Sequence, residues 1–132
     1  MTMTVESKTV DVPHSAQEVY AFASNFENYS RLIPPQVEGW QATADTCSFK
    51  VGGFVQLSMR IEERCPYTLV SIAPDGATAV PLHIKLEIGE KGASSSVRIL
   101  VDVEGGNPMI TMMLKPKLKE AVDKIVDQLK YI

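Results

Sequence analysis

The hydrophobic period of the chain changes twice, and these two changes restrict its fold more than any other feature. Between residues 37 and 104 apolar residues mostly alternate with polar ones, which is typical of strands with one buried face. After Gly105 and Gly106 the apolar residues recur every three or four positions, as on one side of a helix. The sequence therefore predicts an antiparallel meander followed by a C-terminal helix that packs on its apolar face.

Six strands are predicted in the meander, at residues 37–44, 47–51, 54–64, 67–73, 80–90 and 94–104. Turn-forming Gly, Pro and Asp residues separate most of them. Three strands alternate most clearly, and their apolar members are Val55, Leu57, Met59 and Ile61; Leu82, Ile84, Leu86 and Ile88; and Val97, Ile99, Val101 and Val103. One face of the sheet is thus expected to be apolar and the other polar.

The segment before the meander predicts a strand and two short helices. Residues 5–12 are rich in Val and Thr, as strands are. Ser15 and Glu18 form a capping-box pattern, so a helix is expected to begin near Ser15. Residues 26–32 predict a second helical segment, which the following Pro-Pro pair terminates. All of these elements are expected to form one domain over residues 1–132.

The C-terminal helix is predicted from an apolar stripe and contains one proline. The stripe consists of Leu114, Leu118, Val122, Ile125, Leu129 and Ile132. Pro116 lacks the N–H that would bond the carbonyl of Met112, so a kink or break is expected near residues 112–115. We hypothesise that the Met-rich piece before this break acts as a separate lid over a cavity.

Charge and motifs exclude several classes of function. A net charge of −3 and a pI of about 5.4 disfavour nucleic-acid binding. Cys47 and Cys65 show no metal-ligand spacing and are expected to be reduced, packed thiols. The sequence also contains no phosphate-binding loop. Neither a metal nor another cofactor is therefore expected. The sequence has neither a secretory signal pattern nor an apolar run of ~20 residues, which predicts a soluble cytoplasmic protein without a transmembrane segment.

The order of elements, together with several short strings, resembles the START-like superfamily. This superfamily is also called the polyketide cyclase/dehydratase and lipid-transport group, and it includes the major birch-pollen allergen. The strings are VDVP at residues 10–13, which runs into SAQEVYAF at 15–22, then residues 29–34, and NPMI at 107–110. The resemblance implies an α+β helix-grip fold, in which a curved antiparallel sheet of about seven strands wraps around the C-terminal helix.

The resemblance also implies a cavity between the sheet and this helix. Members of the superfamily bind lipids, sterols, polyketides or plant metabolites, and a minority catalyse cyclisation or dehydration. We therefore expect a carrier or sensor of a small hydrophobic molecule or lipid, present as a monomer or weak homodimer. The residues expected to line the cavity are Trp40, Val55, Leu57, Met59, Leu82, Ile84, Leu86, Val97, Ile99, Val101, Met109, Met113, Leu114, Leu118 and Val122.

Two other functions remain open at the level of sequence. A cyclase or dehydratase would need an ionisable group inside the cavity. The alternation places few ionisable groups there. Glu6 and Lys8 are separated from Val10 by an even number of positions and are expected to face the same way, so they are the expected exceptions, together with Tyr20 and Tyr67. This shortage favours binding, and no catalytic residue is assigned. A protein-interaction module is the third interpretation, and it would require an exposed apolar patch.

Overall fold

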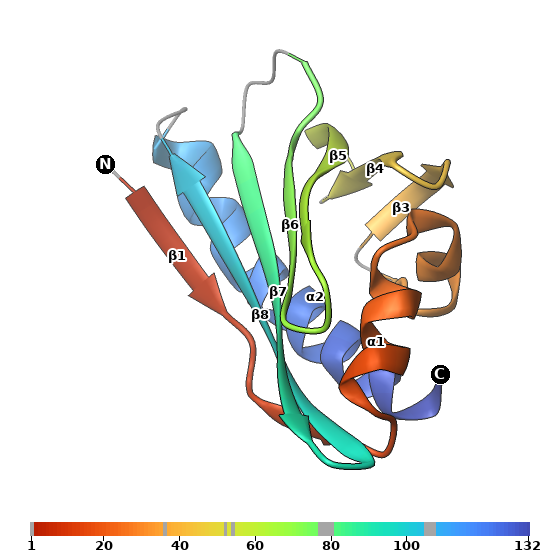
Figure 1. Ribbon diagram of the computed structural model, residues 1–132. Coiled ribbons are helices and arrows are strands. Elements are labelled where there is room, and N and C mark those ends of the chain that lie inside the picture. The colour runs from red at the N-terminus through yellow and green to blue at the C-terminus, as the bar shows by residue number, and fades with distance from the viewer. Residues whose placement is uncertain (1, 36, 52, 54, 77–80, 105–107) are drawn as a thin grey trace.

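The computed structural model describes residues 2–35, 37–51, 53, 55–76, 81–104 and 108–132. In these ranges the chain forms an antiparallel sheet and several helices (Figure 1). The strands are β1 (Thr2–Glu6), β2 (Val10–Val12), β3 (Val37–Ala42), β4 (Thr46–Val51), β5 (Val55–Cys65), β6 (Leu69–Pro74), β7 (Leu82–Lys91) and β8 (Ser94–Glu104). The helical segments are α1 (Ala16–Ala23), the 3-10 turns η1 (Phe26–Arg31) and η2 (Leu129–Tyr131), and α2 (Pro108–Gln128).

Neighbouring strands pair in the order β1–β8–β7–β6–β5–β4–β3, and β2 also pairs with β8. Every pairing is antiparallel. Consecutive strands from β3 to β8 are therefore neighbours, as predicted for a meander. The last hairpin is closed by Gly92 and Ala93, and Gly92 has a φ of 65°, which glycine adopts without steric strain.

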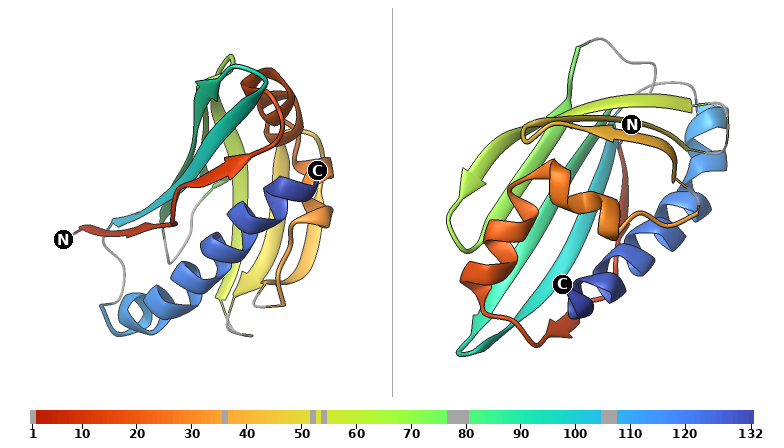
Figure 2. Two further views of the ribbon diagram at one scale, coloured as in Figure 1. Left: turned by 90° about the horizontal axis from the view of Figure 1, so that it is seen from below. Right: turned by 90° about the vertical axis from the view of Figure 1, so that its right-hand side faces the viewer.

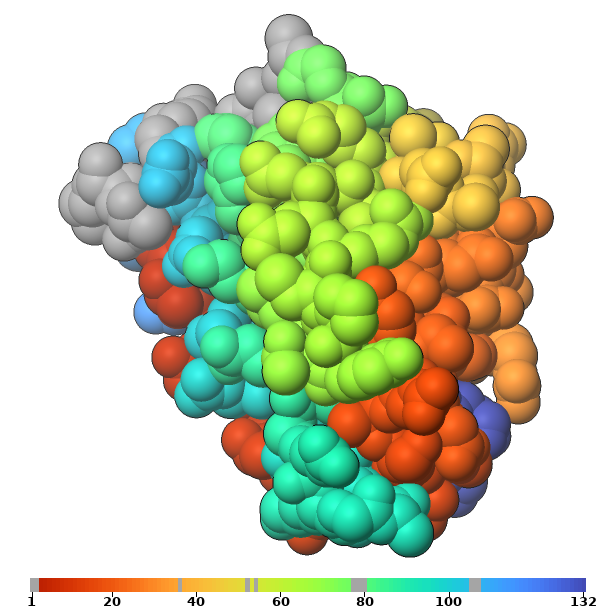
Figure 3. Space-filling model, in the orientation of Figure 1, coloured from red at the N-terminus to blue at the C-terminus, as the bar shows by residue number. Residues whose placement is uncertain are grey.

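The sheet curves around α2, which crosses one of its faces (Figures 1 and 2). Seen from the opposite face, the strands hide most of α2 in the space-filling view of Figure 3. Helix α1 packs against β6, β7 and β8. The predicted α+β helix-grip fold is thus confirmed, with a core between the sheet and the helices.

The alternating strands bury most of the residues that their period predicts, although Ile61 and Ile84 are only partly buried. Val97, Ile99, Val101 and Val103 of β8 are at most 4% exposed, whereas the residues between them are partly exposed. Burying a side chain of this size stabilises the fold by about 1.5–3 kcal/mol. The predicted limits of the six strands agree with the structure to within two residues, although residues 54 and 80, where two of them were expected to begin, lie outside the described residues.

The N-terminal strand differs from the prediction. Instead of one strand at residues 5–12, the chain forms β1 and β2, both paired with β8. Glu6 pairs with Leu100 and Val10 with Val97, so the register shifts by one residue between these pairs. A one-residue insertion of this kind is a β-bulge, which bends a strand. Over the described residues the sheet therefore has eight strands rather than about seven.

The bulge also reverses which residues of this segment face the core. Ser7 is buried; its N–H donates to the Ile99 carbonyl at 2.8 Å, and its hydroxyl oxygen accepts from the Ile99 N–H at 2.8 Å. Glu6 and Lys8 are exposed instead. The expectation that these two charged residues point inward is wrong, because it extended the alternation of Val10 through the bulge.

Helix α1 begins where the capping box predicts. The hydroxyl oxygen of Ser15 accepts a hydrogen bond from the backbone N–H of Glu18 at 3.2 Å, and the hydroxyl group donates to the Glu18 carboxylate at 3.3 Å. The first bond satisfies a backbone donor that the first turn of a helix leaves free, and the second joins the two side chains of the capping box. The helix buries Ala16, Val19 and Ala23 against the sheet.

Helix α2 continues across Pro116, so of the expected kink or break the break does not occur. Because the proline has no N–H for the carbonyl of Met112, one helical hydrogen bond is absent there. Figure 2 shows the first turns of α2 inclined to the rest, so the helix bends but does not end. The Met-rich segment is therefore the beginning of α2 rather than a separate lid.

The remainder of α2 follows its predicted stripe. Leu114, Leu118 and Val122 are buried and Ile125 is partly buried, and the stripe continues past α2 with the buried Leu129 of η2 and the partly buried Ile132. The outer side of the helix carries charged residues instead. Among the described helices none is long and apolar enough to cross a membrane.

Candidate functional site

A cavity of about 100 Å³ lies in the core between the sheet and α2. Strands β3 to β8 supply most of its wall, η1 closes one end, and α2 covers it. Its lining is apolar or aromatic apart from one thiol and one phenol: Phe26, Tyr29, Ile33, Val37, Trp40, Cys47, Phe49, Val51, Met59, Ile72, Leu82, Ile84, Leu86, Ile99, Val101, Leu118, Ala121, Val122 and Ile125.

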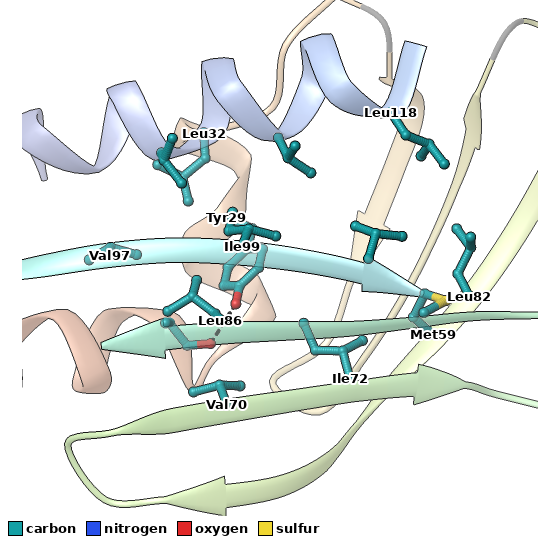
Figure 4. Close-up of a cluster of buried hydrophobic side chains, with 14 of the residues drawn as sticks. Tyr29, Leu32, Met59, Val70, Ile72, Leu82, Leu86, Val97, Ile99 and Leu118 are labelled. Carbon is teal, nitrogen blue, oxygen red and sulfur yellow. Dashed lines mark hydrogen bonds between the residues drawn. The ribbon is translucent and has the colours of Figure 1, made fainter. Parts of the chain in front are cut away.

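The central part of the wall comes from alternate residues of adjacent strands. Figure 4 shows Leu86 of β7 and Ile99 of β8 side by side, with Leu118 of α2 on the opposite side. Leu86 and Ile99 are directly paired in the antiparallel register, so their side chains lie on the same face. The alternation of each strand thus brings apolar side chains from distant parts of the chain to one surface.

Four aromatic rings surround one end of the cavity. The ring of Trp40 stacks on that of Tyr29 with centroids 6.1 Å apart and planes 4° apart. Its centroid lies 6.1 Å from that of Phe26 and 5.7 Å from that of Phe49. Trp40 follows Gly39, which has a φ of 64° within an irregularity of the β3–β4 pairing. This local bend of β3 positions the indole against the rings of η1 and β4.

Two of the lining side chains can ionise, and burial moves the pKa of both further above pH 7. Burial raises the pKa of the Tyr29 phenol, whose hydroxyl donates to the carbonyl of Ala23 at 2.7 Å. Burial likewise raises the pKa of the Cys47 thiol to about 12. Among the described residues no carboxylate, ammonium, guanidinium or imidazole group lines the cavity. The site can therefore hold an apolar molecule but offers little acid–base chemistry.

The cavity approaches solvent between β3 and the second half of α2. Ile33, Val37, Trp40 and Ile125 line it and remain partly exposed. An open groove adjoins this region, and Ile33 borders both hollows. The groove is formed by Arg31, Leu32, Ile33, Pro34, Pro35, Lys124, Asp127 and Gln128. We take the cavity mouth to be the gap beside Ile33.

The residues predicted from sequence fall into three groups. Trp40, Met59, Leu82, Ile84, Leu86, Ile99, Val101, Leu118 and Val122 lie around the cavity. Val55, Leu57, Val97 and Leu114 are buried elsewhere in the core. Met109 and Met113 are 72% and 50% exposed on the outer side of α2. A role of any of these residues in binding a ligand stays a prediction.

Sequence reasoning missed several residues of the wall, chiefly Phe26, Tyr29, Phe49 and Ile72. Phe26 and Tyr29 lie on a short helical segment. The spacing of its apolar residues predicts that they are buried but not which residues they contact. Tyr20 and Tyr67 were expected to be ionisable groups inside the cavity. Their rings pack edge to face with centroids 5.6 Å apart, and neither residue lines the cavity. Both cysteines are free, and no cluster of three or more metal-ligating side chains occurs within the described ranges.

Comparison with known proteins identifies the family. Residues 12–130 match the family described as "Polyketide cyclase / dehydrase and lipid transport". The chain belongs to this family, and the START-like resemblance expected from the sequence is confirmed. Among curated proteins no match is found.

Solved structures share the fold at low sequence identity. A START superfamily protein from Mycobacterium smegmatis is 19% identical with a TM-score of 0.65, over 96% of this chain and 98% of that chain. Norcoclaurine synthase from Thalictrum flavum, solved in complex with dopamine and hydroxybenzaldehyde, is 11% identical with a TM-score of 0.71, over 98% and 85%. The di-domain ARO/CYC protein BexL is 15% identical with a TM-score of 0.65, over 97% of this chain but 46% of that one.

Proposed function

We propose that this protein binds a small hydrophobic molecule, or the apolar part of a lipid, in the cavity between the sheet and α2. The observation that supports this function is the cavity itself, whose described lining contains no charged side chain. Apolar pockets of this kind bind ligands mainly by removing apolar surface from water. A carrier or sensor role agrees with the mention of lipid transport in the family description.

The volume of the cavity limits the ligand. An apolar cavity of roughly 150 Å³ holds one benzene molecule, and the present cavity measures about 100 Å³. It is smaller than that cavity, so in this conformation it accommodates at most one small ring or a short branched chain. A larger ligand would have to extend through the mouth beside Ile33 or separate α2 from the sheet.

A polyketide cyclase- or dehydratase-like enzyme is the second candidate. The family description and the likeness to BexL favour it. The chemistry of the lining does not, because Tyr29 and Cys47 are both held in their protonated forms. A general acid or base works best with a pKa near the working pH. We therefore assign binding without catalysis as the main function.

The emission of Trp40 provides a direct test, because the chain contains one tryptophan and its indole borders the cavity. Titration with single-ring aromatics, short fatty acids and sterols should give a saturable change in emission with about one site for the small compounds. The same compounds should raise the thermal midpoint, since a ligand at 100 times its Kd stabilises the native state by about 2.7 kcal/mol. Absence of both responses across the panel would contradict the proposal.

A matched pair of variants assigns the response to the cavity. Ala121 of α2 lines the cavity and is 5% exposed, whereas Glu120 beside it faces solvent. Ala121→Phe should fill the cavity and weaken binding at least tenfold, while Glu120→Phe adds the same ring outside and should leave affinity unchanged. Recovery of the ligand unaltered after incubation supports binding, and loss of water from it supports the enzyme.

The setting of the protein is also part of this proposal. We propose a cytoplasmic location, because both cysteines are free thiols. We further propose a monomer or weak homodimer, which sedimentation analysis over a range of protein concentrations would measure. A stable higher oligomer would contradict this expectation.

A further inference from the structure

Helix α2 carries a second apolar stripe, on the side opposite the core. Met109, Met112 and Met113 are 72%, 75% and 50% exposed, and Pro116 is exposed next to them. These four residues follow the spacing i, i+3, i+4 and i+7, so they share one face of the helix. They are called the methionine face below. In both views of Figure 2 the first turns of α2 lie at the edge of the molecule.

The methionine face does not belong to the cavity. None of its residues lines that cavity, whereas Leu118 of the same helix does. Exposure of large apolar side chains is unfavourable in water unless another surface covers them, so a contiguous exposed group marks an interaction site. Methionine is flexible and polarizable and suits a surface that adapts to varied apolar partners.

Lysines border the methionine face on both sides. At about 100° per residue, Lys115 and Lys119 fall on one flank of the face and Lys117 on the other. From Pro108 to Lys119 the helix carries three lysines and no acidic residue, although the whole chain has a net charge of −3. No ion pair engages Lys115 or Lys117 within the described residues. This end of α2 is thus locally basic in an acidic protein.

We propose that the methionine face docks the protein on an anionic lipid surface, with the first turns of α2 at the interface. An amphipathic helix binds such a surface by inserting its apolar side chains between headgroups while flanking lysines contact lipid phosphates. The first turn of α2 has no acidic residue, so the positive end of the helix dipole adds to this attraction.

A second copy of the chain fits the methionine face less well. A symmetric dimer places the same patch of each subunit against the other. A dimer centred on Met112 and Met113 would bring Lys115 and Lys117 of both subunits together, and the acidic residues that follow on this side of the helix, Glu120 and Asp123, already pair with Lys124 and Lys119 of their own chain. The face is also a convex helix surface rather than a groove, which suits a deformable bilayer. Docking is separate from occupation of the cavity, so the two proposals can fail independently.

Vesicle flotation of the full chain tests the proposal. The protein should float with mixed phosphatidylcholine–phosphatidylglycerol vesicles in low salt, bind pure phosphatidylcholine weakly, and dissociate as salt screens the charges. Lys115→Gln with Lys117→Gln should weaken binding about fivefold per lysine, or about 25-fold together. Met112→Gln with Met113→Gln should weaken it at least as much while leaving the thermal midpoint unchanged, because both side chains are exposed.

Two lysines on other elements provide the matched control. Lys50 of β4 and Lys85 of β7 are exposed and far from α2 in sequence. Lys50→Gln with Lys85→Gln removes the same charge and should retain the binding of the unmodified protein. The proposal is overturned if no anionic vesicle binds, or if this control loses as much affinity as the Lys115 and Lys117 pair. A concentration-dependent dimer that the methionine variant abolishes would assign the face to a second copy instead.

Discussion

At the scale of single residues, the cavity contains two groups whose chemistry depends on burial. The thiol of Cys47 and the phenol of Tyr29 both face an apolar wall, and burial is the main cause of the raised pKa of each. Removing either proton would place a negative charge where no described cation lines the cavity. Both groups therefore act as packing side chains near neutral pH, which agrees with binding rather than catalysis.

The two cysteines should differ sharply in reactivity. With a pKa of about 12, Cys47 is buried and almost entirely protonated at pH 8, where about one thiol in ten thousand ionises. Cys65 is partly exposed on β5, although its hydrogen bond to Glu63 also raises its pKa. Iodoacetamide should therefore modify Cys65 first, as intact mass over time would show.

A Cys65→Ser variant isolates the buried thiol for the same measurement. In this variant, iodoacetamide should leave Cys47 unmodified in the native state and modify it at an ordinary rate once denaturant is added. A small apolar ligand should slow any residual reaction, because Cys47 borders the cavity. If the native Cys47 reacts as fast as Cys65 in the unmodified protein, then the described burial of this thiol is incorrect.

At the scale of elements, the bulge between β1 and β2 depends on one buried hydroxyl. The Ile99 N–H has lost its regular strand partner and donates to the Ser7 hydroxyl oxygen at 2.8 Å. That hydroxyl in turn donates to the Lys8 carbonyl at 2.8 Å. Serine therefore replaces a backbone acceptor at the point where the register shifts, and an apolar residue of similar size would not.

Ser7→Ala should accordingly destabilise the protein more than an ordinary serine substitution. The change leaves a buried N–H without an acceptor, which costs about 1–3 kcal/mol. The control is Thr4→Ala in β1, which removes an exposed hydroxyl bond of 2.7 Å to Asp102 and should change stability by less than about 0.5 kcal/mol. Urea unfolding measures both. Equal effects of the two variants would show that the Ser7 hydroxyl does not support the bulge.

Pro116 provides a second prediction for an element. Proline in the interior of a helix is about 3 kcal/mol less favourable than alanine. Since α2 continues through Pro116, a Pro116→Ala variant can restore the missing hydrogen bond to Met112 and should raise the free energy of unfolding by about 1–3 kcal/mol. Urea unfolding and hydrogen exchange over residues 109–116 would measure the gain. A loss of stability would indicate that the bend itself is needed for packing.

The elements show where the sequence was informative. In β5, β7 and β8 the strict alternation predicted the strand limits and the buried face, because each strand pairs with neighbours on both sides and has one wet face. The bulge at Ser7 was not visible, since an inserted residue leaves the composition of a strand unchanged. The continuity of α2 was not visible either, because packing against the sheet stabilises helix beyond what Pro116 removes.

At the scale of the whole molecule, the alternating pattern of a strand does not show which of its buried residues line the cavity. Val55, Leu57 and Met59 share one face of β5, and all are buried, but Met59 alone of the three lines the cavity. Alternation gives the face of a residue, whereas the curvature of the sheet decides its position relative to α2. The rings of Trp40 and Tyr29 likewise meet through the bend of β3 and the placement of η1. Such contacts come from the assembled fold.

The raised pKa of Cys47 makes a further prediction for the stability of the whole molecule. The thiol titrates near 9 when unfolded and at about 12 in the native protein. Below pH 9 both states keep the proton, and the stability is fully present. Between pH 9 and 12 the unfolded state releases this proton while the native state retains it, so the free energy of unfolding falls as pH rises. Tyr29 acts in the same direction at the alkaline end.

Urea unfolding between pH 8 and 11 should therefore show decreasing stability, with a slope of at most about 1.4 kcal/mol per pH unit from Cys47. A Cys47→Ala variant removes this proton from both states. It should be less stable at pH 8, because a buried side chain is truncated, but its stability should decrease less steeply above pH 9. Lysine ion pairs such as Lys8–Asp127 also weaken at high pH, and they do so equally in both proteins. Parallel curves for the two proteins would mean that the Cys47 thiol reaches water before the chain unfolds, as an opening of the cavity beside α2 would permit.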